Sequence, residues 1–252
     1  MTKHLIIPDS HAHPDFHNER ADLVGHLIND EQPDVVINMG DLFDMPSLAT
    51  YDRGKRSFAG RSYAKDIESG VEFQDRMWSI VKARKRKMPR RVSLIGNHEY
   101  RIDRVLDLSP ELEGTVSYKD MQLDRYWDEV VPYVGQTPGT IEIDGVYYAH
   151  FFVSGVMGRP ISGIHPGYSL ITKQLRSTTC GHVHTFDHCV RSATDGKKIN
   201  GLCCGVFQDY DSPWAGEVNN EWCRGVVIKH NVNEGQYDLE WVSMDRLKKE
   251  YS

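Results

Sequence analysis

The sequence has no long hydrophobic run. No stretch approaches the roughly 18 apolar residues that a membrane-spanning helix needs. The first residues, Met1-Thr2-Lys3-His4, lead directly into a strand-like segment, without the apolar region and small-residue cleavage site of a secretory signal. These absences argue against a membrane partner and predict a cytoplasmic location.

Paired cysteines and a positive overall charge are missing as well. The chain has five cysteines, an odd number, and none of them has the paired spacing of a zinc ribbon. Reduced thiols are the simplest account of them. The net charge is −6, which argues against a protein that coats nucleic acid generally, because such proteins are normally basic overall.

What the sequence does have is enough length and apolar content for a sizeable core. Its 252 residues are 39% hydrophobic. It shows no internal repeat, low-complexity tract or linker. We therefore expect one domain over residues 1–252.

Three apolar runs in the first half of the chain each lead into a short polar loop. Residues 5–7 precede Asp9 and His11, residues 35–39 precede Asp41 and Asp44, and residues 91–95 precede Asn97 and His98. A helical pattern over about residues 18–30 separates the first two runs. Such a strand–helix–strand unit places its loops at the carboxyl ends of parallel strands. We expect these loops to face one crevice, with the Asp9–His11 segment extended so that both side chains converge.

The second half of the chain consists mainly of predicted strands. Residues 140–143 turn at Asp144-Gly145, a strong hairpin signal, into a strand that ends at His150. A predicted helix around residues 168–175 leads to a further strand and then to Gly181-His182-Val183-His184. Two histidines one residue apart after a glycine turn are able to bind two neighbouring ions from one loop.

The polar residues of these five loops share one chemistry. They are oxygen or imidazole donors, with no cysteine: Asp9, His11, Asp41, Asn97, His150, His182 and His184. This donor set suits divalent transition metal ions, with Mn as the first choice and Fe, Ni, Co or Zn as alternatives. Seven donors are too many for one tetrahedral ion and fit two ions that share a carboxylate. Asp41 is the natural bridge, because it lies centrally between the early and late ligands.

The succession of these blocks resembles the calcineurin-like metallophosphoesterase family. The blocks occur in the family's order over residues 9–184, about 70% of the chain. They are Asp9-x-His11, Gly40-Asp41-x-x-Asp44, Gly96-Asn97-His98-Glu99, His150 and Gly181-His182-x-His184. The resemblance implies an α/β fold of four layers, in which two mixed β-sheets are flanked by helices, with a dinuclear metal centre at the sheet edge.

The resemblance also implies roles for the site residues. One metal would be held by Asp9, His11, Asp41 and His184, and the other by Asp41, Asn97, His150 and His182. A metal-bridging hydroxide would attack phosphorus, His98 would protonate the leaving alkoxide as general acid, and Asp44 would orient the His98 imidazole. General acid catalysis of this kind contributes about 10²–10⁴-fold. Four further histidines are interpreted as surface or supporting residues: His13, His17, His165 and His188.

The sequence defines the substrate less narrowly than the metal ligands. Met45-Pro46 stands where the Ser/Thr protein phosphatases of the family have Arg-Gly, so protein phosphatase activity is not expected. Residues 82–91 contain seven basic residues out of ten. One interpretation is a solvated helix end whose cations favour the helix dipole, and the other is a phosphate-attracting patch whose contacts are salt-sensitive.

Arg53, Arg56 and Arg101 are the candidate substrate-binding residues. Together with the basic run they favour a phosphodiesterase that acts on a nucleotide or nucleic acid. One alternative is a phosphomonoesterase for a small metabolite. The other is a non-catalytic binding scaffold of the same fold, which is less favoured because no ligand of the family pattern is missing.

Overall fold

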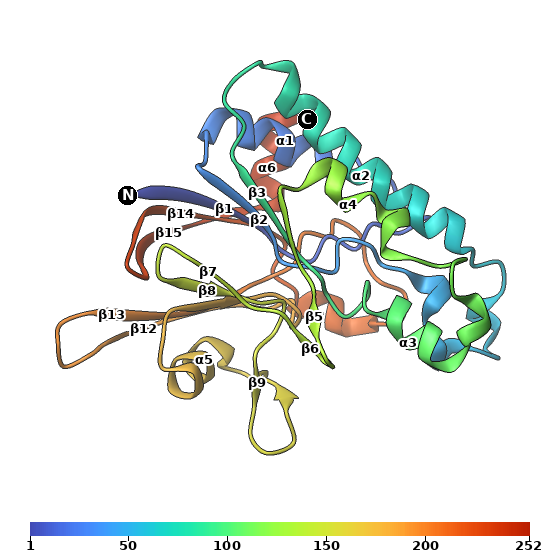
Figure 1. The fold of residues 1–252 in the computed structure, drawn as a ribbon. Helices are drawn as coiled ribbons and strands as arrows, with labels where there is room; N and C mark the ends of the chain where they lie inside the picture. Colours follow the sequence, from blue (N-terminus) through green and yellow to red (C-terminus); the bar gives the residue numbers. More distant parts are fainter.

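The computed structural model describes residues 1–252 and contains two mixed β-sheets that lie face to face (Figure 1). The first sheet has the strand order β15-β14-β1-β2-β3-β4, and the second has the order β12-β13-β11-β8-β7. The first consists of β1 (Thr2–Ile7), β2 (Val35–Asn38), β3 (Arg90–Leu94), β4 (Glu129–Val131), β14 (Gly225–Asn233) and β15 (Gln236–Ser243). The second consists of β7 (Ile141–Ile143), β8 (Val146–Tyr148), β11 (Thr178–Cys180), β12 (Phe186–Ser192) and β13 (Lys198–Cys204).

Helices cover the outer face of each sheet (Figure 1). The first sheet is covered by α1 (Arg20–Glu31), α2 (Tyr63–Ala83), α4 (Leu123–Tyr126) and α6 (Met244–Tyr251), and the second by α5 (Pro166–Gln174). A further helix, α3 (Arg101–Leu108), follows β3. Two small hairpins complete the fold: β5 (Tyr133–Val134) with β6 (Thr137–Pro138), and β9 (Val153–Ser154) with β10 (Arg159–Pro160). The predicted four-layer sandwich is confirmed.

The alternation of side chains along β1 explains the layers. Leu5 and Ile7 pack with Val24 and Trp78 in the core between the first sheet and its helices. Ile6, which points to the opposite face, belongs to the core between the two sheets, together with Tyr148, Leu202 and Cys204. A strand that is apolar on both faces is typical of a central strand covered on both sides.

Parallel pairing brings the polar loops to one edge. β1 pairs in parallel with β2, β2 with β3, and β3 with β4. In the second sheet β11 is parallel to both β8 and β13. The carboxyl ends of these strands therefore carry the loops that the sequence analysis singled out.

The structure also refines the sequence predictions. The helix expected over residues 18–30 is α1, and the helix expected around residues 168–175 is α5. Residues 45–65, between β2 and α2, contain three short 3₁₀ turns, at Pro46–Leu48, Thr50–Asp52 and Arg56–Phe58. The expected extended conformation at His11 is wrong, because this residue has a left-handed backbone with φ of 44°.

No helix in the structure is both long and apolar enough to cross a lipid bilayer.

Gly70 of α2 packs closely against Phe43 in the loop after β2. A Cβ atom at this position would lie 2.0 Å from the Phe43 ring, two residues after Asp41. We expect Gly70→Ala to destabilise the protein by about 1–3 kcal/mol, because the ring must move in a packed core. Chemical denaturation measures the free energy of unfolding of each variant. The exposed Ser79→Ala on the same helix is the control, and equal or greater stability of Gly70→Ala would contradict the close packing.

Candidate metal centre

Five loops meet along one edge of the two sheets. The main-chain N–H of His11 donates to the carbonyl oxygen of Asp41 (2.8 Å), and that of Gly181 donates to the carbonyl oxygen of His150 (3.0 Å). Gly96 allows the loop after β3 to approach closely, since a Cβ there would lie 2.1 Å from Asp41 Oδ1. The main chain itself thus fastens these loops to one another.

The first group of donors consists of Asp9, His11 and His184, whose ligand atoms all lie within 4.8 Å of one another. His184 Nε2 is 3.3 Å from Asp9 Oδ2 and 3.1 Å from His11 Nε2. All three residues are buried. They come from the loops after β1 and β11.

The second group consists of Asp41, His150 and His182, again within 4.8 Å of one another. Asn97 joins it, because its Oδ1 is 2.9 Å from His150 Nε2. Asp41 also forms a group with His11 and His98, so its carboxylate lies between the two clusters. The structure thus brings together all seven residues that the sequence nominated as metal ligands.

A carboxylate oxygen without a partner and two facing imidazole nitrogens indicate that this cluster fits a cation. Asp9 Oδ1 is buried and has no hydrogen-bond partner, although such groups are normally paired. The Nε2 atoms of His11 and His184 face each other (3.1 Å), an arrangement in which at most one of them donates. Carboxylate oxygens and neutral imidazole nitrogens that point at one space are what divalent transition metals require.

The charges of the cluster support the same conclusion. Burial alone would raise the pKa of Asp41, but His150 and His98 outweigh it and hold this pKa well below its usual range. Burial lowers the pKa of His150, whereas Asp41 and Asp9 raise it to about 10. The carboxylates thus draw a positive charge to this site. His182 has its pKa lowered to about 4 by burial and by His150, which favours the neutral form that binds metals.

Four of the seven candidate ligands have a left-handed backbone. The φ angles are 44° at His11, 50° at Asp41, 71° at His182 and 61° at His184. This conformation is uncommon outside glycine and costs roughly 1–3 kcal/mol where it is not relieved locally. Its concentration at one place indicates that the surrounding fold imposes the orientation of these side chains.

His98 lies beside the donor groups, held by Asp44 and Arg101. Its Nδ1 donates to the main-chain oxygen of Asp44 (2.7 Å) and is 3.1 Å from the Asp44 carboxylate. Arg101 Nη2 is 3.0 Å from His98 Nε2. Burial and Arg101 lower the pKa of His98, but Asp41 and Asp44 outweigh them, so the pKa is raised overall.

The three arginines expected to bind substrate occupy different environments. Arg101 is buried, and its Nη1 donates to the carbonyl oxygens of Asp44 (2.7 Å) and Met45 (3.1 Å). Arg53 and Arg56 are exposed in the segment between β2 and α2, without a hydrogen bond to any of the donor groups. The basic run at residues 82–91 ends in the first two residues of β3 and therefore lies at the other end of that strand from the donor groups.

Comparisons with known proteins agree with this geometry. The family model described as calcineurin-like phosphoesterase matches residues 2–200, which include every candidate ligand. The chain belongs to this family. Membership implies a metal-dependent phosphoester hydrolase that acts on a phosphoester substrate, and the clustered His and Asp residues are its candidate ligands for divalent ions.

The chain is also similar to solved structures of distant proteins. One is described as a novel archaeal phosphodiesterase; it is 13% identical, with 95% of this chain and 99% of that chain covered and a TM-score of 0.43. Another is the protein TT1561 of Thermus thermophilus, 9% identical, with 95% and 98% covered and a TM-score of 0.36. No curated protein matches the chain in sequence.

Glu99 is a buried residue of the site to which the sequence analysis gave no role. Its carboxylate accepts the main-chain N–H groups of Asp41 (3.0 Å), Phe43 (2.9 Å) and Gly96 (2.8 Å). It thereby joins the loops after β2 and β3. Its place as the last residue of the Gly96-Asn97-His98-Glu99 block was the only signal in the sequence.

Arg20 is a second supporting residue that the sequence analysis missed. Its buried guanidinium donates to the carbonyl oxygens of Ser10 (2.7 Å), His11 (3.3 Å) and Phe207 (3.1 Å). These bonds hold the loop that presents His11. A signal existed, because Arg20 shares the helical spacing of Val24 and Leu27, which places its charge on the buried face.

Aromatic rings flank the cluster on two sides. The Trp222 ring lies 4.5 Å from that of His184, and the exposed Trp214 lies 5.9 Å from Trp222. On the other side the Phe151 ring is 4.8 Å from that of His182. Aromatic rings thus pack directly against two of the candidate ligands, His184 and His182.

We expect Glu99→Gln to lower the free energy of unfolding by about 1–3 kcal/mol. The amide keeps one acceptor oxygen but turns an N–H₂ group toward buried main-chain donors, which leaves part of the set unsatisfied. Thermal unfolding in EDTA measures this without a contribution from bound metal. Glu142→Gln is a matched control, because Glu142 accepts a main-chain N–H from Gly145 at the surface. Equal stabilities of the two variants would contradict the role of Glu99.

Proposed function

We propose that the protein is a dinuclear metal-dependent phosphodiesterase that acts on a nucleotide or nucleic acid. The observation that carries the proposal is the position of Asp41 between two donor groups, with His98 beside them. Family membership supports the hydrolytic activity. A cytoplasmic location, the choice of Mn and a single domain over residues 1–252 remain part of the proposal.

The residues that would hold the ions follow from the two donor groups. Asp9, His11, Asp41 and His184 would bind one ion, and Asp41, Asn97, His150 and His182 the other. A pair of divalent ions supplies a water of lowered pKa and neutralises charge on the phosphoryl oxygens. His150 is oriented for this role, because its Nδ1 donates to the carbonyl oxygen of Met39 (2.9 Å) and leaves Nε2 facing the cluster.

His98 would supply the proton to the leaving alkoxide. The bond from its Nδ1 to Asp44 fixes the ring and leaves Nε2 as the atom that faces the site. Arg101 lies next to that atom, so its positive charge favours release of the proton once Nε2 carries one. Arg101 is therefore suited to lower the pKa of His98. After a rotation of its side chain, it would also be able to contact a phosphoryl oxygen.

The preference for nucleotide diesters rests on the surfaces around the centre. An alkyl or sugar leaving group needs the acid that His98 provides. The exposed Trp214, which packs against the buried Trp222 beside His184, and the half-buried Phe151 beside His182 are the aromatic rings near the cluster that could stack on a base. Arg53 and Arg56 remain candidates for more distant phosphates.

The test of the proposal is a substrate comparison with added Mn. We expect faster hydrolysis of bis-p-nitrophenyl phosphate than of p-nitrophenyl phosphate, and turnover of a dinucleotide. A clear preference for the monoester would support the phosphomonoesterase alternative instead. Fewer than one metal ion per chain, with no activity on either ester, would support the binding scaffold.

We expect His98→Ala to retain both ions and to lose about 10²–10⁴-fold in kcat on an alkyl phosphodiester, because only the proton donor is removed. Metal analysis and steady-state kinetics measure the two properties separately. Asp41→Asn is the contrasting variant: the shared carboxylate is weakened, so the metal content itself should fall. Near-normal rates for His98→Ala would show that another group protonates the leaving oxygen.

We expect Trp214→Ala to raise KM for a dinucleotide about 5- to 150-fold, the range that corresponds to the 1–3 kcal/mol of one base stacked on an aromatic ring. Trp214→Phe should retain most of the affinity. The exposed Tyr168→Ala on α5 is the control for loss of a surface aromatic ring. An unchanged KM for Trp214→Ala would remove this ring from the substrate site.

A further inference from the structure

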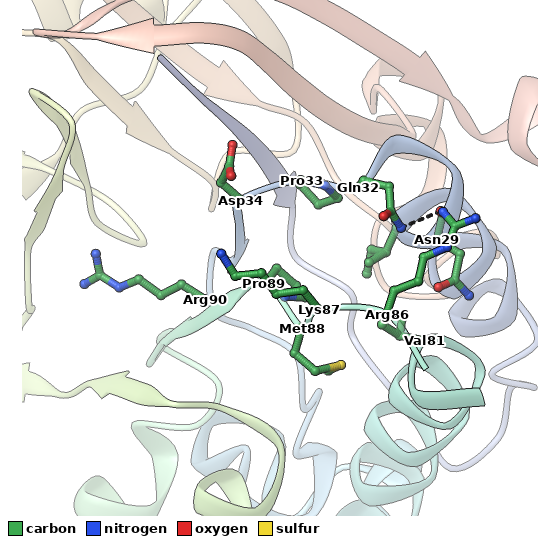
Figure 2. A pocket seen from close by; sticks show the side chains of 11 residues that line it. Asn29, Gln32, Pro33, Asp34, Val81, Arg86, Lys87, Met88, Pro89 and Arg90 are labelled. Atoms are coloured by element: carbon green, nitrogen blue, oxygen red, sulfur yellow. Dashed lines mark hydrogen bonds between the residues drawn. The ribbon is translucent and has the colours of Figure 1, made fainter. Parts of the chain in front are cut away.

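A cavity of about 340 Å³ lies where α1 and α2 end and β2 and β3 begin. Its walls include the apolar side chains of Ile28, Val81 and Met88, and the amides of Asn29 and Gln32 reach it from the end of α1. Figure 2 shows Arg86 lying along these amides, while Arg90 extends away from them. The cavity therefore combines an apolar lining, hydrogen-bonding amides and a cationic rim.

The rim carries positive charge that the protein itself does not balance. Of the seven cations in residues 82–91, Arg90 pairs with Glu129 and Arg91 with Asp128. The other five are exposed and have no ion pair: Lys82, Arg84, Lys85, Arg86 and Lys87. The nearest acidic wall residue, Asp34, already accepts the main-chain N–H of Lys3 (2.8 Å). This concentration is unusual in a chain of net charge −6.

The helix dipole does not account for the whole basic run. α2 ends at Ala83, and a dipole stabilises cations only within the last turn. Lys85, Arg86 and Lys87 lie beyond the helix, in the connection to β3. Like charges at neighbouring positions repel one another, and a bound polyanion relieves this repulsion.

We propose that residues 82–91 and the adjoining cavity bind single-stranded nucleic acid. The exposed cations contact successive phosphates, and one base enters the cavity, where its flat faces meet Val81 and Met88. The amide N–H groups of Asn29 and Gln32 already donate to the carbonyl oxygens of Ile80 (3.0 Å) and Asn29 (2.9 Å), so their side-chain oxygens accept from the polar edge of the base. The cavity has the size of a small-molecule ligand site, at the lower end of the usual 300–1,000 Å³ range. The inference deepens the proposed function by naming its substrate class, and only its effect on turnover rests on that function.

The surroundings favour nucleic acid over an anionic membrane. None of the large apolar side chains exposed on the protein lies in residues 20–35 or 80–92, so no side chain is available there to insert into lipid. The amide groups of Asn29 and Gln32 lie inside a cavity, where the headgroups of a flat membrane surface do not reach them. It does offer hydrogen bonds to an unpaired base, which exposes both its edges and its faces.

The patch and the candidate metal centre lie at opposite ends of β3. This strand has five residues, Arg90–Leu94, and so separates them by about 17 Å at roughly 3.3 Å per residue. At the duplex spacing of about 3.4 Å per nucleotide, about five nucleotides of a strand reach from one to the other. A dinucleotide in the centre therefore gains nothing from the patch, whereas a long strand gains affinity.

The experiment measures binding separately from catalysis. Fluorescence anisotropy of a labelled single-stranded 20-mer is recorded in EDTA, which prevents metal-dependent cleavage, over 50–200 mM salt. We expect Lys85→Glu combined with Lys87→Glu to weaken binding at least tenfold. The loss of two phosphate contacts should also make the salt slope shallower by about 1.4, at about 0.7 per contact. Lys173→Glu with Lys249→Glu, the same charge change at exposed sites elsewhere, should bind like wild type.

Three outcomes would overturn the inference. The first is a wild-type protein that does not bind the 20-mer at 50 mM salt, and the second is an equal loss of affinity in the patch and control variants. The third is tighter binding to anionic phospholipid vesicles than to the 20-mer, lost in the same patch variant, which would assign the patch to a membrane surface.

Turnover then separates this inference from the proposed function. With Mn present, the ratio of kcat/KM for the 20-mer to that for a dinucleotide should fall at least tenfold in the patch variant and stay constant in the control. A constant ratio in the patch variant counts against delivery of the strand from patch to centre. If no phosphodiester is hydrolysed by any of the proteins, the proposed function fails, and the anisotropy result still decides whether the patch binds nucleic acid.

Discussion

Two buried aspartates dominate the electrostatics of this fold. Asp9 is fully buried and Asp41 is 2% exposed, and a carboxylate removed from water is stable only beside positive charge or hydrogen-bond donors. The protein provides donors in part: His182 N–H bonds to Asp9 and His98 N–H bonds to Asp41. The neighbouring imidazoles provide further hydrogen bonds and positive charge. They are arranged so that bound divalent ions could stabilise the two carboxylates in their place. The two sheets, their loops and the supporting Glu99 and Arg20 all serve to hold this charge cluster.

The convergence of the first three loops was predictable because it follows from topology. Parallel strands of one sheet bring their carboxyl ends to one edge, so residues that follow β1, β2 and β3 had to meet there. The loops after β8 and β11 belong to the other sheet, and their place in the site was implied by the resemblance. The helix α1 was also predictable, because its apolar spacing is regular. In contrast, β4 has only three residues, and its pairing with β3 is a tertiary contact that no local pattern encodes.

The details of the site were harder to predict than its existence. Glu99 acts through main-chain N–H groups of distant loops, and Arg20 through main-chain carbonyl groups. Every residue type except proline has the same main-chain N–H and carbonyl groups, so the sequence does not show which residues will be the partners. The extended conformation expected at His11 was wrong because the loop is bonded to Asp41 and bends to satisfy that contact. The roles of the seven candidate ligands remain predictions that their close packing supports.

The left-handed backbone at His11, Asp41, His182 and His184 bears on attempts to alter the metal preference of the protein. Asn, Asp and His enter this region more readily than other residues with a Cβ atom, and β-branched or bulky residues are poorly tolerated there. Ligand exchanges among those three types preserve the local path of the chain. Glutamate and cysteine, the other natural choices for changing the metal preference, lack this tendency, so we expect them to lower the stability of the loop that carries them.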